Sequence, residues 1–178
     1  MLDFPLPVIG FAAFSGTGKT TLLKKLIPLL RAGGLRPGIV KHAHHRVEFD
    51  VPGKDSYELR KAGAGQVLLA SERRWALMAE EPEAAAPGLS VLLERLDTTV
   101  LDLVLVEGFR HLPFPKIELH RPSQGKPLLC LDDETVIAIA ADGEIRRPLS
   151  LPLLDLNDPV AIMEFIKDYC REFRTSVG

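Results

Sequence analysis

Residues 13–21 form the motif with the clearest chemistry in the chain. They read Ala-Phe-Ser-Gly-Thr-Gly-Lys-Thr-Thr, which matches the phosphate-loop pattern GxxxxGK[ST] except that Ala13 replaces the first glycine. Gly16 and Gly18 allow the backbone to curl so that consecutive amides face an anion. A glycine-rich turn with an exposed lysine is the simpler alternative, but an apolar strand before the motif and a helix after it are the context of a true phosphate site.

Two side chains of this motif have distinct tasks in a nucleotide site. Lys19 can reach between the β- and γ-phosphates, and the Thr20 hydroxyl can complete the coordination of Mg²⁺. The motif therefore predicts a nucleoside triphosphate bound with Mg²⁺, and Lys19 is a candidate catalytic residue. The predicted nucleotide-binding residues of the loop are Ser15, Gly16, Thr17, Gly18, Lys19, Thr20 and Thr21.

A carboxylate at the end of a neighbouring strand usually completes the Mg²⁺ site of such a loop. Glu107 directly follows the apolar stretch 101–106 and is the candidate, both as a metal ligand beside Thr20 and as a catalytic residue. Glutamate in place of the commoner aspartate favours a contact through water or a role in orienting the attacking water. The alternative is a glutamate that ends the strand and pairs with Arg110 or Lys116, because a charge beyond a buried strand must be solvated, paired or bound to metal.

A histidine-rich loop follows the second predicted strand. His42, His44 and His45 are three of the five histidines of the chain, and Asp50 and Asp55 come soon after. A closed zinc site needs four ligands, and no cysteine lies nearby in the sequence. Two interpretations stay open: a switch-like loop that contacts phosphate or Mg²⁺, and a solvated polar loop. In the switch-like interpretation, Asp50 is a further Mg²⁺ ligand, and Asp55 either shares that role or only caps a helix.

The sequence contains one candidate for reading the nucleotide base. The guanine signature Asn-Lys-x-Asp is absent, but Asp142 follows the apolar stretch 136–141 and could accept the amino edge of guanine. Asn157 and Asp158 are a second candidate pair, although helix capping already explains Asp158. These motifs alone do not separate ATP from GTP.

Hydrophobic patterning places these residues on alternating strands and helices. Apolar stretches predict strands at 8–13, 37–42, 67–70, 75–78, 101–106, 117–119 and 136–141. Helices are predicted after the phosphate loop, at 56–63, at 89–96 and from 159 onward. The alternation predicts a three-layer α/β fold of the P-loop NTPase type around a mainly parallel sheet, with residues 1–178 forming one nucleotide-binding domain.

Two of these helices have predicted caps. Asp55, with Glu58 three residues later, is similar to a capping box in which aspartate replaces serine or threonine. Asp158 before Pro159 combines an N-cap residue with a proline in the first turn. Both helices are therefore expected to begin one residue after their aspartate.

Charge is distributed unevenly along the chain although the total is nearly neutral. Lysine and arginine number 22 against 24 aspartates and glutamates, which gives a net charge of −2. The segment 4–47 contains seven lysines and arginines and no acidic residue. This favours an anionic ligand near the N-terminal segment, but not nucleic acid, because a nucleic-acid-binding domain usually carries a basic excess overall.

Composition narrows the class of protein further. No apolar run approaches the roughly 18 residues of a membrane span, so no membrane association is expected. The first residues lack a basic leader followed by an apolar stretch, so no signal peptide is expected. Cys130 and Cys170 are the only cysteines, and two thiols are expected rather than a disulfide. These features together predict a cytoplasmic protein.

Six stretches of the chain carry a family resemblance. They are FAAFSGTGKTTLLKKLIP, RPGIVKHAHH, PGKDSYELRKAGA, RRWALM, LDLVLVEGF and LLDLND, and they lie between Phe11 and Asp158. Together they resemble the molybdopterin-guanine dinucleotide biosynthesis protein B (MobB) family. The residues that match its phosphate-loop and acidic positions are Gly16, Gly18, Lys19, Thr20, Thr21 and Glu107.

The resemblance implies more than the residues show by themselves. It implies a homodimer that binds GTP and Mg²⁺, hydrolyses GTP weakly and acts as an adapter when GMP is attached to molybdopterin. The implied partners are the nucleotidyltransferase MobA and molybdopterin-loaded proteins. The preference for guanine comes from the resemblance alone.

Three functional hypotheses follow. The favoured one is a GTP-binding adapter whose hydrolysis is slow, because no obvious glutamine or arginine finger accompanies Glu107 and such an arginine raises rates by roughly 10³–10⁵. The alternative is a small-molecule kinase that transfers the γ-phosphate to a bound acceptor, although no arginine-rich lid segment is evident. The third is a non-enzymatic scaffold in which nucleotide only stabilises a dimer.

Overall fold

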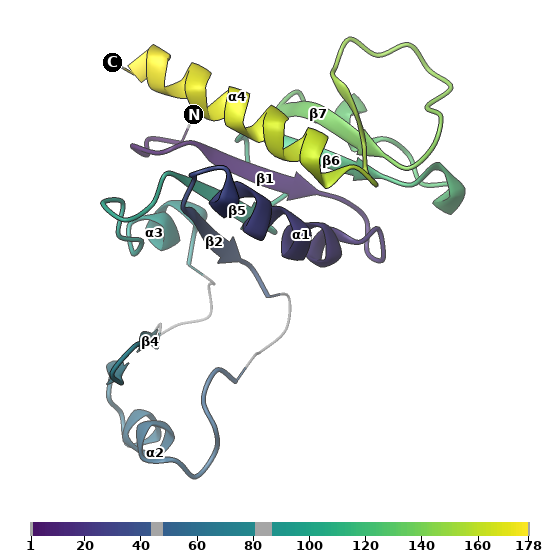
Figure 1. The fold of residues 1–178 in the computed structure, drawn as a ribbon. Coiled ribbons are helices and arrows are strands. Elements are labelled where there is room, and N and C mark those ends of the chain that lie inside the picture. The colour runs from purple at the N-terminus through teal and green to yellow at the C-terminus, as the bar shows by residue number, and fades with distance from the viewer. Residues whose placement is uncertain (1, 44–47, 81–86, 178) are drawn as a thin grey trace. The chain divides into compact units, whose positions relative to one another are not determined.

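The computed structural model describes residues 2–43, 48–80 and 87–177, and the chain forms two compact units (Figure 1). The sheet unit consists of residues 1–42 and 89–178, and the hairpin unit consists of residues 43–88. The single nucleotide-binding domain over residues 1–178 stays a prediction.

A six-stranded sheet forms the centre of the sheet unit. Its strands, in spatial order, are β2 (Pro37–Lys41), β5 (Leu103–Glu107), β1 (Val8–Ala12), β6 (Lys116–His120), β7 (Val136–Ala141) and β8 (Leu153–Asp155). Every neighbouring pair in this sheet is parallel. The predicted α/β fold with a mainly parallel sheet is therefore confirmed, with the short strand β8 in addition.

Helices cover both faces of this sheet and give it three layers. The long helices α1 (Lys19–Ala32) and α4 (Pro159–Val177) pack on one face, and α3 (Leu89–Leu93) packs on the other (Figure 1). Two 3-10 helices, η1 (Pro122–Gln124) and η2 (Leu129–Leu131), lie between β6 and β7. Among the residues that the structure describes, no helix is both long enough and apolar enough to cross a membrane.

The apolar patterning explains how the strands are buried. All five residues of β1 are buried, and alternate side chains of a strand point to opposite faces. Ile9 packs in the core beneath α1 and α4, whereas its neighbour Val8 packs in the core beside α3. Burial of one such side chain contributes about 1.5–3 kcal/mol. The two cores therefore hold the central strands, and the loops that leave them, in fixed positions.

The starts of α4 and α2 test the two predicted caps. Asp158 Oδ1 accepts hydrogen bonds from two backbone amides of the first turn of α4 at 3.0 and 3.1 Å, so this cap is confirmed. The cap predicted at Asp55 is wrong. Helix α2 (Asp55–Lys61) already includes Asp55, and its N-cap is Lys54, which makes no side-chain capping bond. Asp55 instead places a negative charge in the first turn, where the helix dipole favours it.

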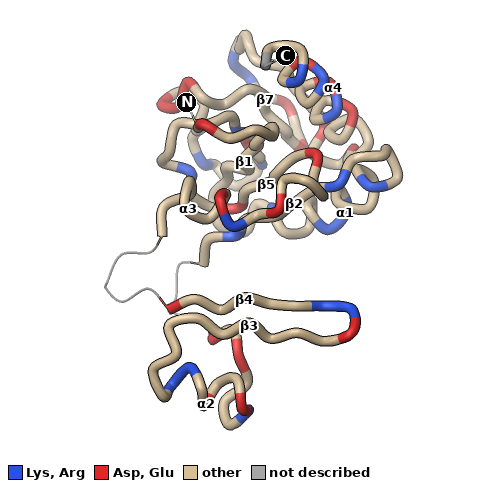
Figure 2. The backbone as a smooth tube through the Cα atoms, turned by 90° about the vertical axis from the view of Figure 1, so that its left-hand side faces the viewer, with Lys and Arg blue, Asp and Glu red and all other residues tan. Residues whose placement is uncertain are grey.

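The hairpin unit contains α2 and an antiparallel pair of strands, β3 (Gln66–Ala70) and β4 (Trp75–Ala79). Both predicted strands are confirmed, and each is one residue longer than expected. Neither strand contains a charged residue, and the charges lie in the turn between them (Figure 2).

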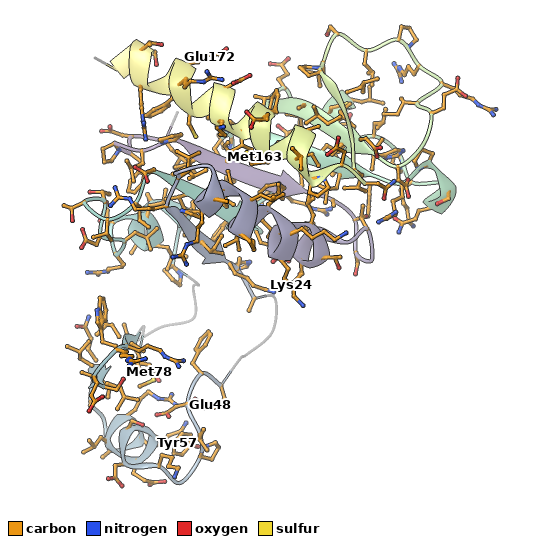
Figure 3. The ribbon with its side chains drawn as sticks, in the orientation of Figure 1. Lys24, Glu48, Tyr57, Met78, Met163 and Glu172 are labelled. Carbon is orange, nitrogen blue, oxygen red and sulfur yellow. The ribbon has the colours of Figure 1, made fainter. Side chains whose placement is uncertain are left out.

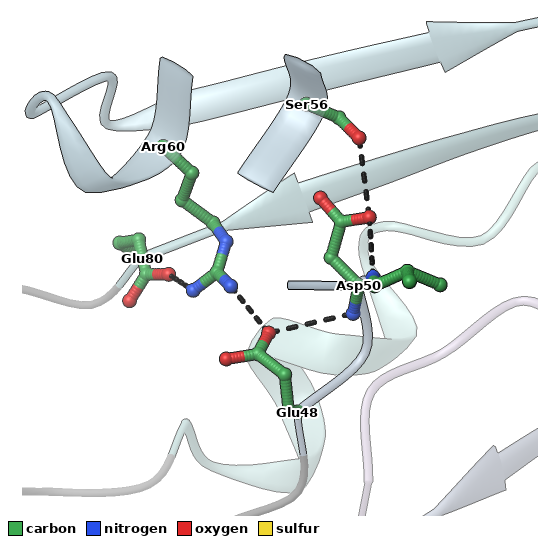
Figure 4. Close-up of polar contacts among 6 residues, drawn as sticks. Glu48, Asp50, Ser56, Arg60 and Glu80 are labelled. Carbon is green, nitrogen blue, oxygen red and sulfur yellow. Dashed lines mark hydrogen bonds and ion pairs between the residues drawn. The ribbon is translucent and has the colours of Figure 1, made fainter. Parts of the chain in front are cut away.

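Arg60 of α2 organises a polar cluster inside the hairpin unit (Figure 4). Its guanidinium pairs with Glu48 and with Glu80, at the end of β4. Beside it, Asp50 Oδ1 accepts hydrogen bonds from the Ser56 hydroxyl at 3.1 Å and from the next backbone amide at 2.8 Å. Asp50 is thus part of the internal network of this unit, and its Mg²⁺-binding role stays a prediction.

Both cysteines are free thiols, as expected. Cys170 is a residue of α4 that is buried in the core, and Cys130 is half-buried in η2. Burial raises the pKa of each thiol to about 11, so both stay protonated near neutral pH.

Candidate functional site

The phosphate loop connects β1 to α1 and has the backbone that its glycines permit. Gly16 has φ 81° and Gly18 has φ 103°, both in the left-handed region that other residues disfavour. Gly18 is the N-cap of α1, so the loop ends where free helix amides attract anions. A pocket here is lined by Ser15, Gly16, Gly18, Lys19, Thr20, Thr21 and Glu107. Of the predicted loop residues, only the buried Thr17 is not part of this lining.

Lys19, at the start of α1, folds back over the loop. Its ammonium donates a hydrogen bond to the Ala13 carbonyl at 3.2 Å. Burial lowers the pKa of Lys19, and the carboxylate of Glu107 opposes that shift. The neighbouring cations Arg110 and Lys41 lower the pKa of Lys19 further. Three cations and one carboxylate therefore gather around the loop, and this excess of positive charge suits a polyphosphate.

Strand pairing brings Glu107 to the loop. The parallel strands β1 and β5 end side by side, with Phe11 opposite Glu107. The Thr20 hydroxyl donates a hydrogen bond to Glu107 Oε1 at 3.3 Å. Lys41, which β2 places opposite Glu107, has its Nζ 3.5 Å from Oε2. The carboxylate therefore faces the loop, and its ion-pair partner is Lys41 rather than Arg110.

The oxygens of Thr20 and Glu107 fit the Mg²⁺ ion of a nucleotide complex. Mg²⁺ holds its ligands at about 2.0–2.1 Å in an octahedron, so adjacent ligand oxygens lie about 3 Å apart. Thr20 Oγ1 and Glu107 Oε1 are 3.3 Å apart, and both are oxygen donors of the kind that Mg²⁺ prefers. A bound ion would supply positive charge next to the phosphates, and phosphate oxygens and water would complete its coordination.

His42 lies at the end of β2, beside the turn that follows β5. Its ring centroid is 4.6 Å from that of Phe109, and its amide donates to the last carbonyl of β5 at 2.8 Å. Gly108 has φ 112°, and a Cβ there would lie 2.6 Å from His42 Cβ, so glycine is required beneath the histidine. His42 therefore packs against this turn, whereas His44 and His45 lie outside the described residues.

Asp142 was predicted to accept the amino edge of guanine, and it lies directly after β7 in an ion pair with Arg121. Arg121 follows β6, and its Nε donates to the Thr17 carbonyl at 2.8 Å. The Thr17 hydroxyl also lies 3.3 Å from the side-chain amide of Gln124. Sequence reasoning missed Arg121 and Gln124, because their place after the apolar stretch 117–119 does not show which strand that stretch pairs with. The base-binding role of Asp142 stays a prediction.

The sheet order and the loop define the class of protein. A parallel sheet whose central strand leads through a glycine loop into a helix, with an acid at the end of the adjacent strand, is the P-loop NTPase type of fold. A crystal structure of Bacillus subtilis MobB is 26% identical, with a TM-score of 0.70 over 91% of this chain and 97% of that chain. A MobB homologue from Bacillus stearothermophilus, 23% identical, has the same fold with a TM-score of 0.68 over 93% of this chain and 98% of that chain.

Sequence comparison identifies the family. The family model for molybdopterin guanine dinucleotide synthesis protein B (MobB) matches residues 8–142. A molybdopterin-guanine dinucleotide biosynthesis adapter protein from Escherichia coli K12 is 51% identical over 168 residues, which are 94% of this chain and 95% of that protein. A Haemophilus influenzae protein of the same description is 44% identical over 94% of this chain and 92% of that protein. The chain belongs to the MobB family.

Proposed function

We propose that this chain is an adapter protein in the biosynthesis of molybdopterin-guanine dinucleotide and that it binds GTP with Mg²⁺. The adapter role is supported by the E. coli and H. influenzae relatives, both of which are described as adapter proteins of this biosynthesis. The observation that best supports a nucleotide site is the pairing of Thr20 with Glu107. The Thr20 hydroxyl lies 3.3 Å from Glu107 Oε1, beside a loop whose two glycines have the left-handed backbone that phosphate binding needs.

The proposal extends to the partners of the chain. MobA, the nucleotidyltransferase that would attach GMP to molybdopterin, is the proposed partner in the cytoplasm, together with molybdopterin-loaded proteins. Hydrolysis of GTP by the chain alone is proposed to be weak and to need Mg²⁺, since an arginine supplied by a partner can raise such rates by roughly 10³–10⁵. A sustained rate of many GTP turnovers per second by the purified chain would contradict the adapter role.

The experiment that tests the site is a calorimetric titration of GTP and ATP, each with and without Mg²⁺. We expect GTP to bind more tightly than ATP, and Mg²⁺ to tighten GTP binding. In the Glu107→Ala variant, the gain from Mg²⁺ should fall by about 10–100-fold, because one protein contact to the ion or to its water shell is removed. An undiminished Mg²⁺ effect in this variant rules out the metal role of Glu107.

A matched control and a product assay complete this test. Glu172 lies exposed on α4 (Figure 3), so Glu172→Ala removes the same charge without touching the loop and should leave both titrations unchanged. The nucleotide products are analysed together with molybdopterin as acceptor. A phosphorylated acceptor would identify the chain as a small-molecule kinase instead of an adapter.

We also propose that two copies of the chain associate through the hairpin unit. Three large apolar side chains of β3 and β4 are exposed on one face of the hairpin, namely Leu68 at 64%, Trp75 at 68% and Leu77 at 44%, because the register pairs Leu68 with Leu77 and Ala70 with Trp75. An isolated two-stranded hairpin is marginally stable in water, and a contiguous exposed apolar surface commonly marks a protein interface. Covering by a second copy would remove this surface from water and support the homodimer that the family resemblance implies.

Substitution of Leu68 and Trp75 by serine should convert the proposed dimer into a monomer, because both side chains lie on the same exposed face and would lose their apolar contacts with the partner. Light scattering after size-exclusion chromatography measures the mass of the assembly. The control is Val160→Ser on α4, which is exposed to a similar extent at 50% and should leave the mass unchanged. A monomeric wild-type chain, or a serine variant that remains dimeric, would contradict the proposed interface.

A further inference from the structure

Arg121 joins the phosphate loop to the end of a strand two positions away in the sheet. It directly follows β6, and its Nε donates a hydrogen bond to the Thr17 carbonyl at 2.8 Å. Its terminal NH1 group pairs with the carboxylate of Asp142, directly after β7. A guanidinium presents several donors in one rigid plane, so a single side chain can hold both acceptors at once.

The bond to the Thr17 carbonyl has a consequence for the neighbouring amide. Thr17 O and the N–H of Gly18 belong to one peptide plane, and no cis peptide occurs among the described residues. In a trans peptide the carbonyl and the amide point in opposite directions. When Arg121 holds the carbonyl on its side of the loop, the Gly18 amide must therefore face the other way. Gly18 lines the phosphate pocket, so this orientation makes its amide a donor for an anion.

A second contact holds the same residue. The Thr17 hydroxyl donates to the Phe14 carbonyl at 2.9 Å, and the Gln124 side-chain amide lies 3.3 Å from that hydroxyl. Thr17 is only 2% exposed, so its side chain has little freedom to turn. Two residues of the segment after β6 therefore contact Thr17. Arg121 binds the backbone carbonyl of Thr17, and Gln124 contacts its side-chain hydroxyl.

We propose that Arg121 is a positioning residue that fixes the Thr17–Gly18 peptide for phosphate binding, and that Asp142 acts through Arg121 rather than by reading the guanine base. The proposal rests on the nucleotide site proposed above and assigns a different task to Asp142. The carboxylate of Asp142 orients the guanidinium, which orients the loop. The contribution of both residues is therefore independent of the base.

The experiment compares three ligands that share a triphosphate and differ in the base: GTP, ATP and inorganic tripolyphosphate, each with Mg²⁺. Arg121→Ala should weaken all three by the same factor, about 10-fold or more, because a charged hydrogen bond to the loop is lost. Asp142→Asn should weaken all three by a smaller common factor and should add nothing in the Arg121→Ala background. Arg121→Lys keeps the charge near Asp142 but not the planar set of donors, and should lie between wild type and Arg121→Ala.

The chain contains a matched control for this experiment. Arg36 also pairs with an aspartate, Asp102, with its Nε 2.8 Å from Oδ2, and neither residue lines the phosphate pocket. Arg36→Ala and Asp102→Asn should bind all three ligands as the wild type does. The thermal unfolding midpoint of each variant checks that the apo chain is folded.

The possible results separate this proposal from its alternatives. If Asp142→Asn weakens GTP but not ATP or tripolyphosphate, Asp142 reads the base and the proposal is wrong. If Arg121→Ala binds tripolyphosphate as tightly as wild type, the positioning role is wrong. A wild-type chain that binds no GTP contradicts the proposed function itself. In that case the NMR chemical shift of the Gly18 amide in the apo chain still tests the positioning role of Arg121. A change in this shift in Arg121→Ala but not in Arg36→Ala supports the role, and an unchanged shift in Arg121→Ala overturns it.

Discussion

Replacement of Lys19 by alanine is expected to weaken the binding of GTP with Mg²⁺ by about 100-fold, the largest effect of any substitution in the phosphate loop. The Lys19 ammonium is partly buried above the loop, and within the described part of the chain it hydrogen-bonds to a neutral group, the Ala13 carbonyl, at 3.2 Å. Phosphate oxygens would offer it charged acceptors in an environment less screened than water. Alanine would leave those oxygens without their nearest cation.

The pH dependence of binding follows from the same side chain. Burial lowers the pKa of Lys19 in the free chain, and bound phosphates would raise it again by favouring the charged form. Binding would then take up protons wherever the free ammonium has begun to deprotonate. GTP affinity should therefore fall as the pH rises through the lowered pKa of Lys19, at a lower pH than for an ordinary lysine.

Lys24→Ala is the matched control for Lys19→Ala. Lys24 is an exposed residue of the same helix, α1, and its side chain points away from the sheet (Figure 3). Isothermal titration of both variants should show unchanged binding for Lys24→Ala and little pH-dependent binding for Lys19→Ala. Equal losses in the two variants would mean that the general field of the basic helix, and not a contact from Lys19, governs affinity.

The parts of the site that were predictable are those that local spacing determines. The phosphate loop needs two glycines, a lysine and a threonine within nine consecutive positions, and a strand directly before them. All of these are visible in the sequence. Glu107 was predictable because the apolar stretch before it could only be a buried strand, which leaves its charge at the sheet edge. The cap at Asp158 was also local, since aspartate followed by proline marks a helix start.

The parts that were not predictable depend on which strands become neighbours. Lys41 meets Glu107 only because β2 pairs with β5, and Arg121 meets Thr17 only because β6 lies beside β1. Strand order arises from tertiary packing, and a single sequence does not state it. The wrong cap at Asp55 has a local cause, because the exact first residue of a helix is weakly specified.

Replacement of Lys116 by methionine is expected to lower the free energy of unfolding by about 3–5 kcal/mol, because it removes one partner of a buried ion pair. Lys116 is 1% exposed at the start of β6, and its Nζ lies 3.1 Å from Asp133 Oδ2. It thus pairs with Asp133 and not with Glu107. The ammonium also contacts the Leu112 carbonyl at 2.6 Å, the Phe114 carbonyl at 3.2 Å and the Thr135 hydroxyl at 2.5 Å. Methionine fills the space of the lysine stem but leaves these acceptors without their donor.

The loss in the free energy of unfolding caused by Lys116→Met should become smaller in acid. Burial raises the pKa of Asp133, but hydrogen bonds from Thr135 and Lys116 outweigh this, and its pKa lies below the usual value. A carboxylate with a lowered pKa stabilises the fold above its unfolded pKa of about 3.9 and ceases to do so as the pH falls. As the pH falls below about 3.9 toward the lowered pKa of Asp133, the wild type should therefore lose part of its advantage over Lys116→Met.

Urea unfolding at pH 7 and near pH 3 measures both effects. Lys24→Met is the matched control, since it makes the same substitution at an exposed position and should change stability by less than about 0.5 kcal/mol. The double variant Lys116→Met with Asp133→Asn should recover part of the loss, because it no longer leaves a carboxylate without its cation. A loss below about 1 kcal/mol at pH 7 would show that solvent already screens this pair, as it does at exposed sites. A loss that is the same at both pH values would show that methionine packs poorly there, with no contribution from the charge of Asp133.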